Sequence, residues 1–157
     1  MTLDTRILAE HRALLAEKLE AVERLTGHLE FSLGCNPYPL DSLSLLDPVL
    51  LESVSALVER FGKLQDLLSG VFRELVLLSG EDAVDMNRVF SRMEKIGILE
   101  NVDHWRAMRV PRNLGAHEYD PDDAGRTRFI NALAADAPTL IQIAVRAVDY
   151  AKATFFR

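Results

Sequence analysis

Long stretches with helical spacing of apolar residues dominate this sequence and limit the folds that it can adopt. The clearest stretch runs from residue 47 to residue 80, and its apolar residues recur at intervals of three and four, which places them on one face of a helix. They are Val54, Leu57, Val58, Phe61, Leu64, Leu68, Val71, Phe72, Leu75 and Leu78. Asp47 followed by Pro48 is a favourable helix start, and Gly80 is a typical stop. The sequence therefore predicts one long amphipathic helix here.

Four further segments show the same spacing. We expect helices at about residues 3–29, 83–96, 101–120 and 122–154, with a loop at about 32–41. Asn101 is a suitable cap for the fourth of these five helices, which carries Trp105, Met108 and Leu114. Five helices joined by short loops predict a single all-α, up-and-down bundle that covers residues 1–157.

Proline and glycine interrupt three of these helical patterns. Pro111 removes a backbone donor from the fourth helix, so we expect a kink or a restart there. Pro138 is expected to bend or divide the last helix. Gly62 and Gly70 each cost roughly 1 kcal/mol relative to alanine inside a helix, and close packing against another helix is the simplest reason for them.

Composition narrows the class of protein. A chain of 157 residues with 48% apolar residues suits one folded domain and is too apolar for disorder. The single Cys35 excludes an internal disulfide framework, and we expect a cytoplasmic protein. No apolar run reaches the length of about 18 residues that a membrane span needs, and the first residues do not resemble a secretion signal.

The charge balance argues against a general nucleic-acid coat protein. The net charge is −6, whereas proteins that bind long nucleic acids through their surface field are usually basic. A local basic cleft remains compatible with this total, because five arginines lie close together in sequence: Arg106, Arg109, Arg112, Arg126 and Arg128. Arg126 and Arg128 either form a phosphate-binding rim or an exposed helix face, and the acids at Asp120, Asp122 and Asp123 weaken the first alternative.

The string from residue 112 to residue 119, Arg-Asn-Leu-Gly-Ala-His-Glu-Tyr, carries the chemistry. In the cleavage of an RNA strand, Arg112 can hold the phosphate group at the bond that is cut and stabilise the negative charge that develops on it. His117 can act as general base or acid for a 2′-hydroxyl or a leaving 5′-oxygen. Asn113 would hydrogen-bond the phosphate or orient the imidazole. These groups suffice for RNA cleavage without a metal or other cofactor, with a 2′,3′-cyclic phosphate as product.

The spacing of these residues limits how they can meet. Arg109, Asn113 and His117 are four residues apart and would share one helix face, so Arg109 is a second candidate for positioning substrate. Arg112 is five positions from His117, about 140° around an ideal helix. Either the helix ends near Gly115, or two chains share one cleft across a twofold axis. We favour the shared cleft, and therefore a homodimer.

The pattern Arg112-Asn113-x3-His117-x-Tyr119 resembles the signature of HEPN-domain toxins, specifically the HepT type. Residues 61–66 and 93–99 are similar to the same subgroup, so the resemblance covers about residues 55–120. It implies an all-α dimer, a metal-independent endoribonuclease and a cognate minimal nucleotidyltransferase as antitoxin, in a complex that can be larger than the dimer. It also implies that this antitoxin transfers AMP to Tyr119. Pro111, directly before the motif, departs from the pattern expected of relatives.

Other interpretations stay open beside these. Arg112 and His117 could be surface residues at a helix C-terminus, where the helix dipole stabilises cations. Tyr119 could be a half-buried side chain that packs its ring on the protein and keeps its hydroxyl in water. Lys63 and Asp66 could support His117 or form a solvated ion pair. Trp105, with Met108, is expected in the core, although an exposed indole could stack on a base.

At the level of function, two alternatives remain. The chain could be a non-catalytic HEPN module that binds and regulates a nucleotidyltransferase partner or a nucleotide. It could also be a plain helical interaction domain in which the motif is structural.

Overall fold

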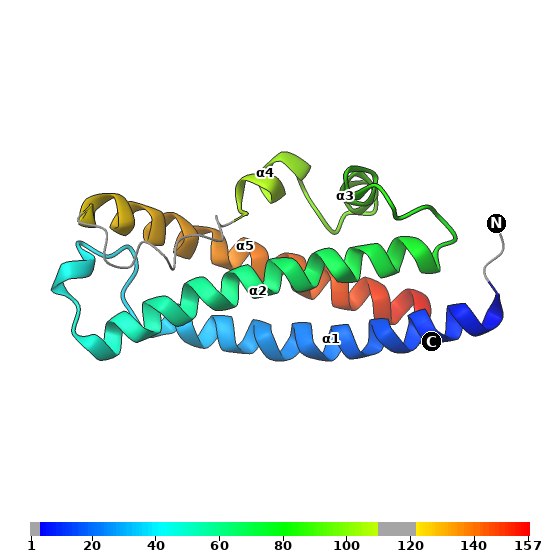
Figure 1. Cartoon of the computed structure of the whole chain (residues 1–157), viewed down its shortest axis with the longest axis horizontal. Coiled ribbons are helices and arrows are strands. Elements are labelled where there is room, and N and C mark those ends of the chain that lie inside the picture. Colours follow the sequence, from blue (N-terminus) through cyan, green and yellow to red (C-terminus); the bar gives the residue numbers. More distant parts are fainter. Residues whose placement is uncertain (1–3, 110–121) are drawn as a thin grey trace.

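Three long helices, α1 (Thr5–Gly34), α2 (Pro48–Leu78) and α5 (Asp123–Phe155), form the body of the molecule (Figure 1). The structure is a computed structural model that describes residues 4–109 and 122–157. Two shorter helices, α3 (Met86–Lys95) and α4 (Val102–Ala107), lie on one side of the long helices, and a 3-10 turn, η1 (Leu43–Leu45), precedes α2. The described residues contain no strand, so the all-α prediction is confirmed for this part of the chain.

The long helices do not simply alternate in direction. Helix α1 runs antiparallel to α2, but α5 begins at the same end of the molecule as α2 and runs in the same direction (Figure 1). Each of the three packs against the other two, and α3 packs on α2. The two short helices therefore belong to the return path between two parallel long helices, which corrects the simple up-and-down order expected for the five helices.

Local signals in the sequence set most helix boundaries. The carboxylate of Asp47 accepts a hydrogen bond from the Leu50 amide at 2.9 Å, with Pro48 in the first turn. The Asn101 side chain accepts from the His104 amide at 3.1 Å. Such caps satisfy amides that have no partner inside the helix. Gly97 follows α3 with a φ of +81°, a conformation that glycine adopts readily. The predicted caps at Asp47 and Asn101 are confirmed.

The fourth helix is shorter than the sequence indicated. It ends at Ala107, and Arg109 lies outside any helix, whereas the expected helix extended to about residue 120. The kink or restart expected at Pro111 lies outside the described residues, and Pro111 lacks the N–H that could donate to the carbonyl of residue 107. Pro138 does not divide the last helix, since α5, 33 residues long, runs through it without interruption. Buried neighbours Ala137 and Leu140 hold that helix on the core on both sides of the proline.

Helix α2 supplies the largest share of the buried core. Its side chains face α1, α5 and the two short helices, and those less than 2% exposed include Leu57, Phe61, Leu64, Leu68, Phe72 and Leu75. Trp105 from α4 packs on this core, with its ring centroid 5.2 Å from that of Phe72 and 6.0 Å from that of Phe90. The indole is only 1% exposed, so Trp105 is a core residue, as expected, and offers no ring face to a nucleic-acid base.

No helix within residues 4–109 and 122–157 combines the length and the apolar composition needed to cross a bilayer.

A matched pair of leucines tests this core. Leu68→Ala removes a side chain that is 0% exposed at the centre of α2 and should lower the free energy of unfolding by about 2–5 kcal/mol. Leu45→Ala removes the same atoms from a side chain that is 75% exposed, and should change it by no more than about 0.5 kcal/mol. Urea unfolding followed by circular dichroism measures both. Equal losses in the two variants would contradict the assignment of α2 to the core.

Candidate functional site

The residues that carry the predicted chemistry fall in the segment 110–121. Arg112, Asn113, His117 and Tyr119 therefore lie outside the described residues. What the structure gives is the scaffold on both sides of them, namely α4 with Arg109 before the segment and α5 with its cap Asp122 after it.

Arg109 is the one predicted site residue next to the motif that the structure describes. Its side chain is exposed, and its backbone amide donates to the carbonyl of Arg106 at 3.1 Å, in the turn that closes α4. Because Arg109 follows the end of the helix, the helical stripe expected to run from Arg109 through Asn113 to His117 has no helical start at Arg109. That part of the sequence prediction is wrong.

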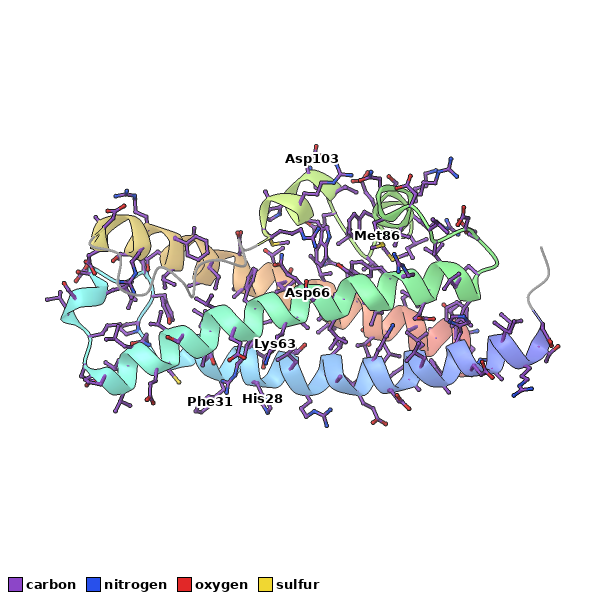
Figure 2. All side chains as sticks on the ribbon, in the orientation of Figure 1. His28, Phe31, Lys63, Asp66, Met86 and Asp103 are labelled. Carbon is purple, nitrogen blue, oxygen red and sulfur yellow. The ribbon has the colours of Figure 1, made fainter. Side chains whose placement is uncertain are left out.

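Lys63 and Asp66 lie on the exposed side of α2 (Figure 2). The ammonium of Lys63 is 2.7 Å from a carboxylate oxygen of Glu59, one turn earlier, and both side chains are more than 60% exposed. This hydrogen bond lowers the pKa of the Glu59 carboxyl. Lys63 thus belongs to a solvated ion pair, with Glu59 as its partner where Asp66 was expected. The role of either residue in supporting His117 stays a prediction.

A buried carboxylate between α1 and α2 was missed by the sequence analysis. Glu74 is 4% exposed, and one of its oxygens is 2.6 Å from Nδ1 of His11. Its other oxygen accepts a hydrogen bond from Nζ of Lys18 at 3.3 Å. Glu74 therefore has a polar partner on each oxygen, which offsets the cost of taking a carboxylate out of water. The available signal was an acid three residues after Val71, within the apolar face of the helix.

Gly70 lies one turn before Glu74 and faces the same cluster. A Cβ atom at this position would be 3.4 Å from Nζ of Lys18, so the glycine leaves room for the ammonium that pairs with Glu74. At Gly62, a Cβ would meet nothing within 4 Å. The expected close packing of helices at both glycines is therefore wrong, because the neighbour of Gly70 is a charged side-chain end and Gly62 faces open space.

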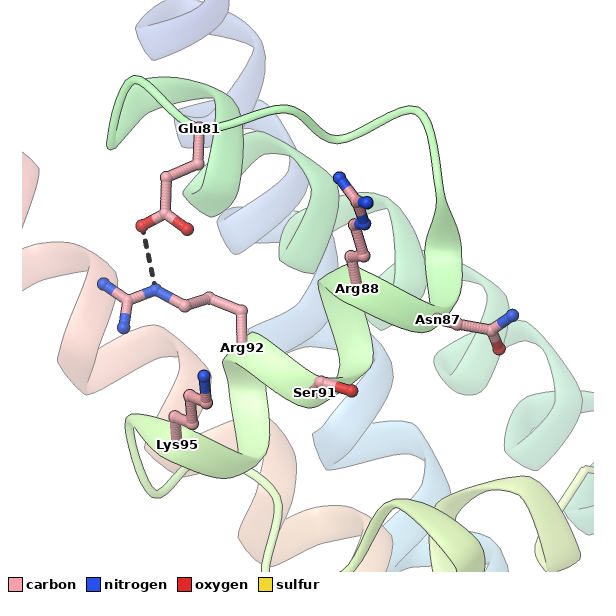
Figure 3. Close-up of a pocket in the computed structure, with 6 residues that line it drawn as sticks. All are labelled: Glu81, Asn87, Arg88, Ser91, Arg92 and Lys95. Carbon is pink, nitrogen blue, oxygen red and sulfur yellow. Dashed lines mark ion pairs between the residues drawn. The ribbon is translucent and has the colours of Figure 1, made fainter.

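The exposed face of α3 forms a basic pocket with a volume of about 330 Å³ (Figure 3). It is lined by Glu81, Asn87, Arg88, Ser91, Arg92 and Lys95. The carboxylate of Glu81 is 3.0 Å from Nε of Arg92, and Arg88 has a longer contact of 3.9 Å to Asp85. Guanidinium and ammonium groups around one hollow are suited to binding an anion. This group of cations was not predicted from the sequence, where the arginines from Arg106 onward stood out.

Arg126 and Arg128 lie in the first turns of α5, Arg126 half-buried and Arg128 exposed. The neighbouring acids have structural roles there. Asp122 caps the helix through the Gly125 amide at 3.0 Å, and Asp123 accepts a hydrogen bond from the Ser42 hydroxyl. The choice between a phosphate-binding rim and an exposed face for the two arginines stays a prediction.

Within the described part of the chain, no three His, Cys, Asp or Glu side chains gather in a way that could hold a metal ion.

Comparison with known proteins adds no assignment: no family model, curated protein or solved structure matches the chain. The resemblance of the motif at 112–119 to HEPN toxins therefore stays a prediction from the sequence.

The cluster at Glu74 yields a stability prediction. Glu74→Gln keeps the shape of the side chain but places an amide N–H₂ group opposite one of two donors, His11 or Lys18. We expect the free energy of unfolding to fall by about 1–3 kcal/mol, the cost of leaving a buried polar group badly paired. Glu52→Gln makes the same change at an exposed site of the same helix and should be nearly neutral. Urea midpoints that shift equally in both variants would show that the buried contacts contribute nothing.

Proposed function

We propose that this protein is a metal-independent endoribonuclease of the HEPN toxin class, HepT type, that acts as a homodimer. The observation that carries the proposal is the string Arg112-Asn113-x3-His117-x-Tyr119, which combines a phosphate-binding cation, an imidazole and a phenol at the spacing of that family. The all-helical arrangement of the described residues agrees with the proposed fold, and it supports the proposal only at that coarse level.

The proposed reaction is an internal transfer at phosphorus. His117 removes the proton from the 2′-hydroxyl, the 2′-oxygen forms a bond to phosphorus, and the bond to the 5′-oxygen breaks. A second imidazole, available in a dimer, gives a proton to the leaving 5′-oxygen. Arg112 stabilises the charge on the phosphate, and Asn113 and Arg109 position it. The products are a 2′,3′-cyclic phosphate and a 5′-hydroxyl.

The flanking scaffold supports an RNA substrate. Arg106 and Arg109 are exposed, and they precede Arg112 by six and three residues. Arg106 is also held toward α3, because its Nη2 donates to Oδ1 of Asn87 at 2.7 Å. Cations on the chain that enters the motif would attract and hold a polyanion beside it.

Regulation by a nucleotidyltransferase partner is part of the proposal. Transfer of AMP from ATP to the Tyr119 hydroxyl would release pyrophosphate and form a phosphodiester at the phenolic oxygen. The added phosphate and nucleoside would put negative charge and bulk two residues from His117, where the RNA phosphate binds. The result would be an inactive toxin as long as the modification remains.

A non-catalytic helical module that binds and regulates the nucleotidyltransferase is the second candidate. The observation in its favour is the net charge of −6, which disfavours association with RNA in general. It makes a different prediction for the motif, because loss of the imidazole would then leave growth and RNA unaffected.

His117→Ala tests the enzyme. The wild-type chain should arrest bacterial growth without its partner and should cleave RNA in the presence of a metal chelator, leaving 2′,3′-cyclic phosphate ends. His117→Ala should lower the cleavage rate at least about 100-fold, the contribution typical of a general acid or base. His104→Ala is the matched control, since His104 is an exposed histidine on α4 that pairs with Asp136 at 3.3 Å. The second candidate would be favoured if the folded wild-type chain and His117→Ala were equally harmless.

A further inference from the structure

Helix α3 carries its cations on one exposed stripe. Arg88, Arg92 and Lys95 are spaced four and three residues apart, so they follow one another along one face of the helix, about one turn of 5.4 Å apart. Ser91 is exposed on the same side, while Val89, Phe90 and Met93 on the other side are buried in the core. We refer to Arg88, Arg92 and Lys95 as the α3 cationic stripe. The buried face fixes this helix on α2, so the cations are presented from a rigid element.

The stripe borders a hollow that could receive an anionic group. The pocket described above has a volume of about 330 Å³, and Ser91 and Asn87 complete its lining. Hydroxyl, amide and cationic side chains are the groups that proteins use to contact nucleic-acid phosphates. Its lining offers no aromatic ring on which a base could stack.

The helix that bears the stripe contacts the helix that precedes the candidate motif. Asn87 at the start of α3 accepts a hydrogen bond of 2.7 Å from Arg106 of α4, and the guanidinium of Arg106 also lies 3.8 Å from the carboxylate of Asp103. Arg109 follows in the turn after α4, and its amide is bonded to the carbonyl of Arg106. Two further exposed arginines, Arg106 and Arg109, therefore lie between α3 and Arg112 along the chain.

We propose that the α3 cationic stripe binds backbone phosphates of the RNA substrate and holds the strand on the path to the motif. The inference deepens the proposed ribonuclease function and rests on it. A row of cations at regular spacing matches a strand with one charge per nucleotide, and such contacts position a strand without reading its sequence. Because the net charge of −6 gives no general attraction for RNA, the affinity has to come from a local site of this kind.

Glu81 opposes this binding in the RNA-free protein. Its carboxylate, 3.0 Å from Nε of Arg92, occupies the guanidinium that a phosphate would use, and both side chains are partly exposed. A phosphate that enters the pocket displaces this carboxylate or shares the guanidinium with it. Removal of the carboxylate charge therefore strengthens RNA binding, an effect that damage to the fold would not produce.

The experiment measures binding separately from cleavage. The full chain with His117→Ala is titrated against a fluorescein-labelled, mixed-sequence, single-stranded RNA of about 20 nucleotides, and anisotropy is recorded at several salt concentrations. The test variant adds Arg88→Gln, Arg92→Gln and Lys95→Gln. The matched control adds Arg12→Gln, Arg24→Gln and Arg73→Gln, three exposed arginines on α1 and α2, so both variants have the same net charge. Circular dichroism confirms that each is folded.

Loss of the stripe should weaken RNA binding at least about tenfold. It should also lower, by about two, the steepness with which the logarithm of the binding constant falls with the logarithm of the salt concentration (the salt slope), because each phosphate contact with a single strand contributes about 0.7 to that slope. The affinity of the control triple variant for RNA should fall less than about threefold, because its substitutions change only the overall electrostatic field of the protein. Glu81→Gln should tighten binding about two- to fivefold, as expected when one like charge is removed beside a cation. Glu17→Gln, at an exposed position on α1, should leave it unchanged.

Two outcomes would overturn the inference. One is equal affinity and salt slope in the two triple variants. The other is binding of poly-glutamate as tight as that of RNA, with the same dependence on the stripe, which would make the surface a dock for an acidic protein segment. Cleavage by the chain with His117 intact is scored apart from these results. If RNA binding needs the stripe but no RNA is cut, the stripe stands and the ribonuclease proposal fails.

Discussion

Burial of α2 on several sides is the interaction on which the rest of the structure depends. Its apolar side chains contact α1 and α5 along most of its length, and Phe72 extends the same core to Trp105 of α4. Hydrophobic burial on this scale is the main favourable term in folding, and each large side chain contributes about 1.5–3 kcal/mol. The short helices have few residues of their own to bury, so their positions follow from that of α2. The cations of α3 and α4 are therefore presented from the same core that holds the long helices.

Glu74 is the exception within this helix, and its surroundings explain how the fold tolerates it. A carboxylate that is 4% exposed would be costly without partners, but α1 supplies His11 and Lys18, and Gly70 leaves room for the ammonium. Both partners come from a different helix, so the cluster also fixes the register of α1 against α2. An apolar residue in place of Glu74 would pack, yet it would not distinguish this register from one shifted by a turn. Specificity of packing is a recognised use of buried polar groups, and the cluster fits that role.

The sequence predicted what depends on neighbours along the chain. The caps at Asp47 and Asn101 and the stop at Gly80 are local features, and each is found where the pattern indicated. The Glu74 cluster was missed because its members lie 56 and 63 residues apart, and no local pattern joins them. The spacing of the cations on α3 is visible in the sequence. The hydrogen bond between Asn87 of α3 and Arg106 of α4 is not, because it joins two different helices. At Pro138 the sequence suggested a bend or a division, and core burial on both sides of the proline holds α5 together as one helix.

The end of α4 at Ala107 bears on how Arg112 and His117 could meet. Their separation of about 140° assumed one unbroken helix through the motif, and a symmetric dimer was one way to resolve it. Since α4 ends at Ala107 and Arg109 is not helical, the register of that helix does not extend to the motif. Residues 112–117 lie outside the described residues, so the separation of about 140° stays an expectation from the sequence. A second argument for the proposed dimer is the proton balance of the proposed reaction, which needs one group to accept a proton and another to donate one. A single imidazole must perform the two tasks in turn, whereas two imidazoles across a twofold axis can perform them in one step.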